Sequence, residues 1–553
     1  MVGTDRMKLL SPPGFRGQFR SDDGARAVYS EGAGIARVWP RAVAAPVDER
    51  DVRTLVAWAR DRSASLVPRG SGSGMAGGAV GDGIVVDLSL LRTMGQVDRE
   101  TLSVRAGAGV LRGDLDRAAR AVGLRLPVDP SSGEFCTIGG MTATNAAGAH
   151  TIRHGSMRAW VRALRCVFDD GSAAEVRHGA PPPDGIPAVA RFLADAHPAI
   201  LASERIAPAG HAGVRKESSG YATAAYATSG ALADLLVGSE GTLALFTEVE
   251  VALQSMPLAT ASVLGAFASV DAAARAAIAA REAGAAACEL LDRTFLDIAM
   301  MGGAQLPVPA GSEAVLIAEI EGASAAETAD GARVLERRFR ECEAVDVTVA
   351  LDAAAEHALW ELRHSVSPIL SRLDSSLKSM QFIEDGAVPP EHLADYIRGV
   401  RSALARRNVG GVIFGHAGYA HVHVNPLIDI RRADWRAQVE GILDDVVALT
   451  ASLGGTLSGE HGDGRLRTPM LPRVWSAAVN ERFAMVKRAF DPTGIFNPGV
   501  KVPIPGQRSV SGVKYDPSLV ALPVSASHVL ERVERDRAYA SFRLALLDGV
   551  STS

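Results

Sequence analysis

Three stretches of small residues constrain the fold of this 553-residue chain more than any other feature. They are residues 68–74 (PRGSGSG), residues 130–148 and residues 237–243 (VGSEGTL). Such stretches pack poorly as core, but glycine lets the backbone approach a ligand closely and lets N–H groups converge on an anion. The first stretch has neither the lysine of a P-loop nor the helix that follows a dinucleotide fingerprint. Taken alone, it is equally typical of a flexible loop between two strands.

Composition places the chain among globular proteins of about three or four domains. Hydrophobic residues make up 47%, charged residues 22%, and the net charge is −5 without a basic block, so we expect no nucleic-acid partner. The 4 cysteines lie far apart and form no CxxC pair, which argues against a bound iron–sulfur cluster and against disulfides. The N-terminal residues contain no apolar signal region. We expect no transmembrane helix and a cytoplasmic location, with peripheral membrane association left open.

Short apolar runs bounded by Gly and Pro alternate with helical patterns, which predicts an α+β fold. After Pro257 a β-α-β repetition suggests a ferredoxin-like module that extends to about residue 430. Residues 1–32 are expected to form an irregular arm. We expect strands at 84–88, 164–168, 243–253, 262–267 and 314–319, and helices at 51–60, 270–283, 289–301, 433–453 and 525–547.

Ionisable residues concentrate in two short segments. Residues 415–426 (GHAGYAHVHVNP) contain His416, His421 and His423, and residues 458–465 (SGEHGDGR) contain Glu460 and His461. Positions 421 and 423 alternate, so in a strand they share one face. Two imidazoles and a carboxylate form a divalent-metal site with open positions, whereas the alternative is a turn of hydrogen-bonded polar residues. The number of histidines favours the metal.

These segments, in this order, resemble the FAD-linked oxidases of the vanillyl-alcohol oxidase/p-cresol methylhydroxylase fold, and most closely their D-2-hydroxyacid dehydrogenase branch. The resemblance covers about residues 35–505. It implies an α+β fold with a two-subdomain PCMH-type FAD-binding domain, a ferredoxin-like α/β cap that holds the substrate, and a C-terminal helical return to the FAD domain. We therefore expect an N-terminal arm (1–34), an FAD-binding domain (35–256), a cap (257–455), a segment returning to the flavin (456–505) and a tail (506–553).

The resemblance also implies the residues that bind FAD. The first loop would wrap the pyrophosphate, the second stretch would follow the flavin and ribityl chain, and Asn497 of the FNPG segment would return to the isoalloxazine. Because the first loop has no histidine, we expect non-covalent FAD. His150 and His154 would contact flavin or lie on the surface. The expected cofactor-binding residues are Arg69, Gly70, Ser71, Gly72, Ser73, Gly74, Pro130, Ser131, Thr137, Gly139, Gly140, Thr144, Asn145, Gly148, Glu240, Gly241 and Asn497.

By the same resemblance, His416, His423 and Glu460 would bind a divalent metal, with zinc expected and manganese or iron as the other candidates. His461 would be the catalytic base. Arg363, in a WxxR segment, would hold the substrate carboxylate. Residues 381–390 resemble the family's FxEDxAVPPE segment. The family's Asp-Gly-Asn is here Tyr419-Ala420-His421, and His421 is either an added ligand or a substrate contact.

The implied activity is oxidation of a D-2-hydroxy acid of the lactate, 2-hydroxyglutarate or glycolate type, by hydride transfer to flavin N5. Without a C-terminal cysteine cluster, we expect a separate electron acceptor, namely an iron–sulfur subunit, an electron-transfer flavoprotein, a cytochrome or a quinone. A homodimer is left open. The alternatives are an alkylglycerone-phosphate synthase-like FAD transferase, an FAD oxidase that uses O2, and a non-catalytic FAD-binding subunit of a larger complex.

Overall fold

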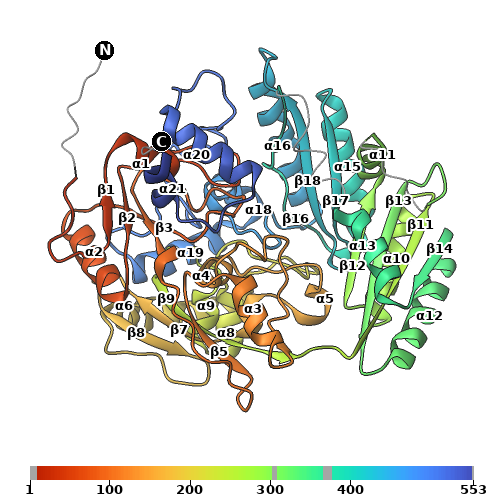
Figure 1. Cartoon of the computed structure of the whole chain (residues 1–553), viewed down its shortest axis with the longest axis horizontal. Coiled ribbons are helices and arrows are strands. Elements are labelled where there is room, and N and C mark those ends of the chain that lie inside the picture. The colour runs from red at the N-terminus through yellow and green to blue at the C-terminus, as the bar shows by residue number, and fades with distance from the viewer. Residues whose placement is uncertain (1–8, 302–307, 365–375, 551–553) are drawn as a thin grey trace.

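Two four-stranded sheets form the N-terminal half of the chain, drawn from red to yellow in Figure 1. The computed structural model describes residues 9–301, 308–364 and 376–550. In the first sheet β2, β4 and β3 are parallel, and β1 is an antiparallel edge strand. In sheet order the strands are β1 (Gln18–Arg20), β2 (Ala42–Ala45), β4 (Ile84–Asp87) and β3 (Leu66–Arg69).

The second sheet is wholly antiparallel. Its strand β9 alternates buried and half-buried residues along its second half, as expected of a strand with one face on a core. Its strands in order are β5 (Ser103–Gly107), β9 (Leu245–Ala252), β7 (Val161–Val167) and β8 (Ala173–Arg177). Strands β6 (Leu124–Arg125) and β10 (Gln254–Ser255) form a small separate pair.

Helices connect and cover these two sheets. In α2, Val52, Leu55, Val56 and Ala59 recur at helical spacing and are buried in the core of the first sheet. The helices are α1 (Asp23–Val28), α2 (Glu49–Asp61), α3 (Arg112–Arg120), α4 (Ile138–Thr144), α5 (Thr151–His154), α6 (Pro187–Arg191), α7 (His197–Ile206), α8 (Thr223–Ser229) and α9 (Leu232–Leu236).

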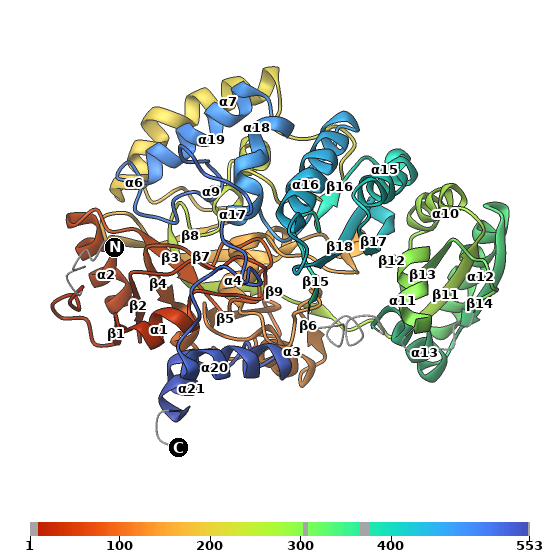
Figure 2. The ribbon, with the colours of Figure 1, turned by 90° about the horizontal axis from the view of Figure 1, so that it is seen from above.

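The cap is built on an eight-stranded sheet at the other end of the molecule (Figures 1 and 2). Its first four strands lie in the order β14-β11-β13-β12, all antiparallel, which is the order of the ferredoxin-like β-α-β-β-α-β arrangement, here with the additional helix α11 between β12 and β13. The expected fold class is confirmed. The strands are β11 (Ala259–Phe267), β12 (Ala287–Asp292), β13 (Ala314–Gly322), β14 (Ala344–Ala350), β15 (Leu377–Ser379), β16 (Gly386–Ala387), β17 (Gly410–His416) and β18 (His421–Asp429).

Alternation along the strands gives the cap sheet two apolar faces. In β11, Val263 and Phe267 pack against one set of helices, and Leu264 and Ala266 pack against the other. The first set is α10 (Val270–Glu282), α12 (Ala325–Glu341), α15 (Leu393–Arg406) and α16 (Trp435–Ser452), and the second is α11 (Arg293–Met301) and α13 (Ala353–His364).

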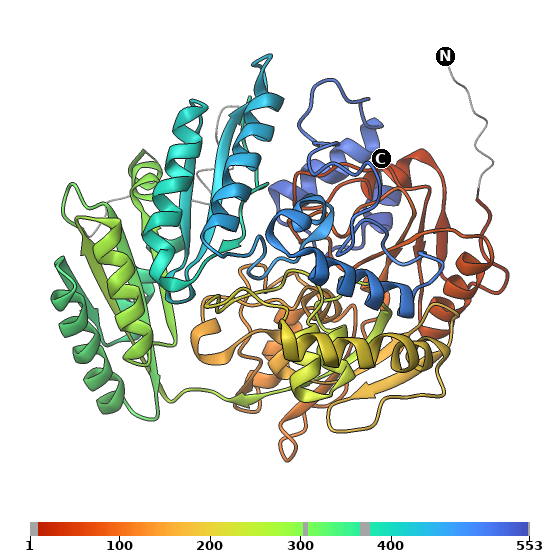
Figure 3. The same ribbon diagram turned by 180° about the vertical axis from the view of Figure 1, so that it is seen from behind.

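After α16 the chain returns to the N-terminal half. Phe483 and Phe490 of α19 are buried in the core of the second sheet, and the blue C-terminal helices lie against the yellow ones in Figure 3. The return comprises α17 (Gly464–Arg467), α18 (Leu471–Val474) and α19 (Ala477–Phe490). Among the described residues, no helix is both long and apolar enough to cross a membrane.

Three expectations about local structure were wrong. Residues 289–292 belong to β12, and the helix begins only at Arg293, because Asp292 accepts a hydrogen bond from the Thr294 N–H (2.6 Å) and so ends the strand. The tail forms two helices, α20 (Val524–Arg535) and α21 (Arg543–Val550), with Arg537 at φ +52° between them. The N-terminal arm contributes β1 and α1.

Candidate active site

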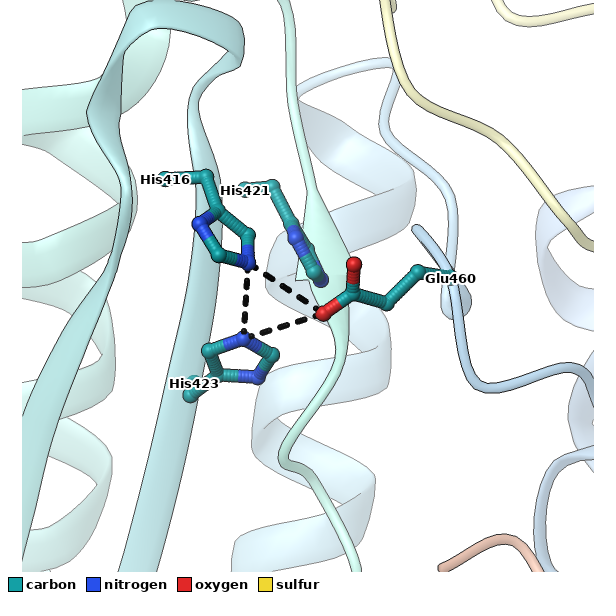
Figure 4. Close-up of side chains that lie close together, drawn as sticks. All are labelled: His416, His421, His423 and Glu460. Atoms are coloured by element: carbon teal, nitrogen blue, oxygen red, sulfur yellow. Dashed lines mark hydrogen bonds and ion pairs between the residues drawn. The ribbon is translucent and has the colours of Figure 1, made fainter. Parts of the chain in front are cut away.

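The two histidine- and glutamate-containing segments meet on one face of the cap sheet (Figure 4). His416 ends β17 and pairs across the sheet with His421 in β18, while His423 lies two residues further along. Alternation sends Val422 and Val424 into the core beneath α10 and α15, so the histidines point to the opposite face. Glu460 reaches the same point from the turn after α16.

The donor atoms lie close enough together to share one cation. Glu460 Oε1 is 3.2 Å from His416 Nε2 and 3.3 Å from His423 Nε2, and the two imidazole nitrogens are 3.5 Å apart. His421 belongs to the same cluster. Each of the four residues offers one ligand atom, and these four atoms lie within 4.8 Å of one another. His423 Nδ1 donates to the Glu384 carbonyl (2.9 Å), which leaves the lone pair of Nε2 facing the cluster.

A buried carboxylate links the metal-type cluster to Arg363. Glu289 in β12 pairs across the sheet with His416, and its Oε1 accepts a short hydrogen bond from His416 Nδ1. Its Oε2 accepts from Arg363 Nε (2.9 Å), and the Arg363 guanidinium lies over the Phe414 ring. Glu289 thus connects Arg363 to the cluster. Sequence reasoning missed Glu289, which carries no local motif.

Asp385 holds the Glu460–His461 turn in place. Its buried carboxylate accepts from Ser458 Oγ (2.8 Å), the His461 N–H (2.9 Å) and the Glu460 N–H (3.2 Å). It also accepts from His421 Nε2 (2.7 Å). His421 is fully buried, and its Nδ1 has no hydrogen-bond partner among the described residues. The position of His421 fits an added ligand better than a contact at an open substrate site.

His461 stacks on His423 and is partly open to solvent. The rings lie 5.4 Å apart, and the side chain of His461 is 28% exposed. Its Nδ1 donates to Glu384 Oε2 (2.7 Å), and its Nε2 lies 3.6 Å from Glu460 Oε1. Arg467 also bonds Glu384. The orientation leaves Nε2 as the nitrogen that can accept a proton next to the metal-type donors.

The ionisable groups of the cluster shift one another's pKa values. Burial alone would raise the pKa of Glu460, but Lys216 and His416 hold it well below its usual value. Burial lowers the pKa of His423, yet Glu384 and Glu460 outweigh it and raise that pKa to about 10. Negative charge thus surrounds His423, and a divalent cation would compete with its proton.

Lys216 is the second residue that sequence reasoning missed. It is 3% exposed, and its Nζ lies 2.5 Å from Glu460 Oε2. The sequence signal that could have identified Lys216 was the rarity of lysine, because only six of the 58 basic residues are lysines. Of these six, Lys216, Lys501 and Lys514 are buried beside carboxylates.

The three glycine-rich stretches come together between the two sheets. A side chain at Gly70 would meet Thr137 Oγ1 at 2.2 Å, so only glycine lets the first loop reach the N-cap of α4. The Glu240 N–H donates to the Ala143 carbonyl (2.8 Å). Asn497 Nδ2 donates to Glu240 O (2.8 Å), tying the third stretch to the C-terminal segment. These segments form one region, which they must do if they bind the same FAD molecule.

Several of the expected cofactor residues have structural partners. Arg69 Nη2 donates to the Glu31 carbonyl (2.9 Å), and Asn145 caps α4 in the left-handed region and accepts from the Arg158 N–H (2.9 Å). The Glu240 carboxylate accepts from the N–H groups of Asp463 (2.6 Å) and Gly464 (2.9 Å). The hydroxyls of Thr137 and Thr144 bond within α4, and Ser71 Oγ donates to Ser73 Oγ (3.1 Å).

The remaining expected positions supply backbone. Gly74 faces open space. At Gly139, Gly148 and Gly241 the backbone is tightly packed, and a Cβ atom there would lie less than 3 Å from a neighbouring atom. Gly72 has φ +74°. Gly140 donates its N–H to Thr137, and Pro130 and Ser131 lie in the turn before α4. Such a backbone-lined surface fits a long, flat cofactor.

His150 is half-buried and His154 is buried, and both connect the two halves. His150 Nδ1 lies 2.5 Å from Asp129 and its Nε2 lies 2.9 Å from Glu319 in β13. His154 pairs with Glu321 (3.1 Å) in the same strand.

Comparison with known proteins decides the family. An FAD-binding domain model matches residues 40–177, and the model of the C-terminal domain of FAD-linked oxidases matches residues 256–500. The chain belongs to the FAD-linked oxidase family. It is therefore an FAD-dependent oxidoreductase, as expected from its sequence. The first two glycine-rich stretches, 68–74 and 130–148, lie within the matched FAD-binding domain.

Curated relatives cover most of the chain. It is 29% identical over 486 residues to the glycolate oxidase subunit GlcD of Bacillus subtilis, covering 87% of this chain and 93% of the relative. It is 28% identical to the D-lactate dehydrogenase of Archaeoglobus fulgidus, and the match covers 83% of this chain and 90% of the relative. It is 28% identical to the D-2-hydroxyglutarate dehydrogenase of Escherichia coli, of whose length it spans only 52%.

Solved structures share the fold. A 4-ethylphenol oxidase from Gulosibacter chungangensis matches with a TM-score of 0.64 at 13% identity, over 88% of this chain and 94% of the other. An alkyldihydroxyacetonephosphate synthase matches with a TM-score of 0.57 at 16% identity, over 87% of this chain and 82% of the other. At these identities the likeness shows the fold alone.

Proposed function

We propose that this chain oxidises a D-2-hydroxy acid of the lactate, glycolate or 2-hydroxyglutarate type to the 2-oxo acid. The observation that carries the proposal is the convergence of His416, His423 and Glu460 beside His461. The names of the curated relatives, which include a glycolate oxidase subunit and D-lactate dehydrogenases, support the same substrate class.

His416, His423 and Glu460 would hold a divalent metal, with zinc as the expected ion and manganese or iron as the others. Two imidazoles and one carboxylate are a donor set that leaves positions open for a substrate. His421, whose Nδ1 has no partner in the described part of the chain, would be the added ligand. Bound FAD would accept the hydride, and the metal would lower the pKa of the substrate hydroxyl.

His461 would take the hydroxyl proton at Nε2. Glu384 fixes its tautomer by accepting from Nδ1 (2.7 Å), and Asp385 fixes its backbone. Arg363 would bind the substrate carboxylate, because a guanidinium matches a carboxylate in two parallel hydrogen bonds. Glu289 holds Arg363 at a fixed place relative to His416. A separate redox partner would then reoxidise the non-covalent FAD.

Anaerobic titration of the FAD-loaded protein tests this function. The flavin absorption band is followed while D-lactate, L-lactate, glycolate, D-malate or D-2-hydroxyglutarate is added, with and without prior EDTA. We expect one D-acid or the achiral glycolate to bleach the band, L-lactate to leave the band unchanged, and EDTA or Glu460→Gln to abolish the bleaching.

The substrate class, the metal and the electron acceptor can each be contradicted by a separate result. If the protein binds FAD but no hydroxy acid bleaches it, the substrate class is wrong. If EDTA-treated protein bleaches at the same rate, the metal has no part in the reaction. Admitting air after bleaching tests the acceptor, since rapid recolouring would indicate an O2-using oxidase in place of a dehydrogenase.

A further inference from the structure

An aromatic side chain, Phe414, lies between the two groups proposed to anchor the substrate. It stands two residues before His416 in β17 and pairs across the sheet with His423 in β18. The rings of Phe414 and His423 lie 5.2 Å apart, and the Arg363 guanidinium lies 4.5 Å from the centre of the Phe414 ring. Phe414 therefore adjoins both the metal-type cluster and the arginine expected to hold the carboxylate.

The other neighbours of Phe414 on this face of the cap sheet are apolar. Leu291 pairs with it from β12, and Val412 precedes it by two residues in its own strand; both are fully buried. The ring of Phe295 in α11 packs edge-on against it at 5.9 Å. Phe414 itself is only partly buried, so part of its surface remains accessible.

Arg363 has N–H groups left for one carboxylate. Its Nε donates to Glu289 Oε2 (2.9 Å), and its side chain is 15% exposed. No acceptor among the described residues bonds its Nη1 or Nη2. A guanidinium offers such N–H groups in parallel, and they match the two oxygens of a carboxylate.

These positions place the side chain of a 2-hydroxy acid beside the aromatic ring. Such an acid carries its carboxylate and its hydroxyl on neighbouring carbon atoms. With the carboxylate on Arg363 and the hydroxyl at the metal-type cluster, the α-carbon lies between the two anchors, next to Phe414. The side chain of the acid starts from this carbon, and one methylene group in an apolar contact changes binding by about 10-fold or more.

The charges around the cluster balance a single substrate carboxylate. The buried carboxylates there are those of Glu289, Glu384, Asp385 and Glu460. In the described part of the chain, the Lys and Arg residues that pair with them are Lys216, Arg363 and Arg467. With neutral histidines and a divalent cation, the site therefore carries one excess positive charge. One substrate carboxylate neutralises this charge, whereas a second one would be buried without a partner, at a high cost in free energy.

We propose that Phe414 determines the specificity of this site, and that the substrate is a monocarboxylic 2-hydroxy acid with an apolar side chain. The ring contacts that side chain, and the charge balance excludes acids with a second carboxylate, such as 2-hydroxyglutarate. The inference rests on the proposed function and narrows its substrate class.

Calorimetric titration of the FAD-loaded protein with 2-oxo acids, in saturating Zn²⁺, tests the proposal without turnover. Pyruvate and 2-oxobutyrate differ by one methylene group, and 2-oxobutyrate should bind about 10-fold more tightly. 2-Oxovalerate and 2-oxoglutarate differ at the end of the side chain, where the latter has a carboxylate. 2-Oxoglutarate should bind about 100-fold more weakly or worse, because that carboxylate finds no partner.

Phe414→Ala separates the contact with the side chain from an effect on Arg363. Loss of the ring can weaken every acid through Arg363, but the comparison within a pair of acids removes that shared loss. The preference for 2-oxobutyrate over pyruvate should fall to near one, while 2-oxoglutarate should still bind weakly. Phe414→Leu should give an intermediate preference. Phe295→Leu, which lies behind the ring, is the matched control and should keep the wild-type preference.

Two results would overturn the inference. One is 2-oxoglutarate binding as tightly as 2-oxovalerate. The other is an unchanged preference for 2-oxobutyrate in both Phe414 variants, each shown to be folded by thermal unfolding.

Flavin bleaching keeps this inference distinguishable from the proposed function. If D-2-hydroxyglutarate bleaches the flavin faster than D-2-hydroxyvalerate, the function stands and the specificity is refuted. If no hydroxy acid bleaches the flavin, the function is refuted and this inference with it.

Discussion

Glu289→Gln tests whether the link between Arg363 and His416 organises the metal-binding residues. Glu289 is 1% exposed, and its two oxygens accept from His416 and from Arg363. A glutamine keeps one acceptor and turns an N–H₂ group toward the other donor, so one charge-assisted bond worth about 1.5–3 kcal/mol is lost.

The expected consequence for metal binding follows from the position of Glu289 behind a ligand. Loss of such an outer partner costs about 10- to 100-fold in metal affinity, or about 1.4–2.7 kcal/mol. The assay is competition for Zn²⁺ between the FAD-loaded protein and a chromophoric chelator. The control is Glu248→Gln, which removes an exposed ion pair with Arg105 (3.1 Å).

Two results would refute this reasoning. One is a folded Glu289→Gln protein with wild-type metal affinity, which would mean that His416 needs no partner or is no ligand. The other is an equal loss in Glu248→Gln, since that residue lies in the second sheet of the FAD-binding half.

Three further perturbations probe other parts of the account. Two carboxylates outweigh burial and raise the folded-state pKa of His150, so its stabilisation is complete below about pH 6.5 and is lost as the pH rises through that raised value. The gap in unfolding free energy between wild type and His150→Asn should therefore be widest below about pH 6.5 and narrow as the pH rises above it, and a gap that stays constant with pH would contradict this reasoning. Lys216→Met should destabilise the metal-free protein by about 3 kcal/mol by removing the buried cation beside Glu460 Oε2; urea titrations should show this loss shrinking with saturating Zn²⁺, and an equal loss with metal would contradict the pairing. Phe339→Ala, which removes a buried ring packed edge-on against Phe267, should cost about 3–5 kcal/mol and leave metal stoichiometry unchanged; a changed metal content would show coupling that the structure does not contain.

Local patterns predicted much of the fold because they report on local causes. The helix expected at 270–283 is α10, whose Ser269 cap and following Gly284 are both readable in the sequence. Residues 289–292 were assigned wrongly because pairing with β13 and β17, which lie far away in the chain, makes them a strand. Apolar residues followed by a helix offer no local sign of that pairing.

The same limit applies to the candidate site. His416, His423 and Glu460 stood out because each lies in a short glycine-flanked motif, and the structure brings them together. Glu289 and Lys216 come from segments more than 100 residues away from His416 and Glu460, respectively. Their roles depend on sheet register and on burial, neither of which a single sequence displays.

The most direct test of the central claim is anomalous diffraction from crystals of the FAD-loaded protein, measured at the absorption edges of zinc, manganese and iron. The account predicts one peak bonded to His416, His423 and Glu460 and next to His461. No peak in crystals of protein that still oxidises a D-2-hydroxy acid would contradict the account. A peak that lies instead at His150, Glu319 and Glu321, another grouping of metal-type donors, would contradict it equally.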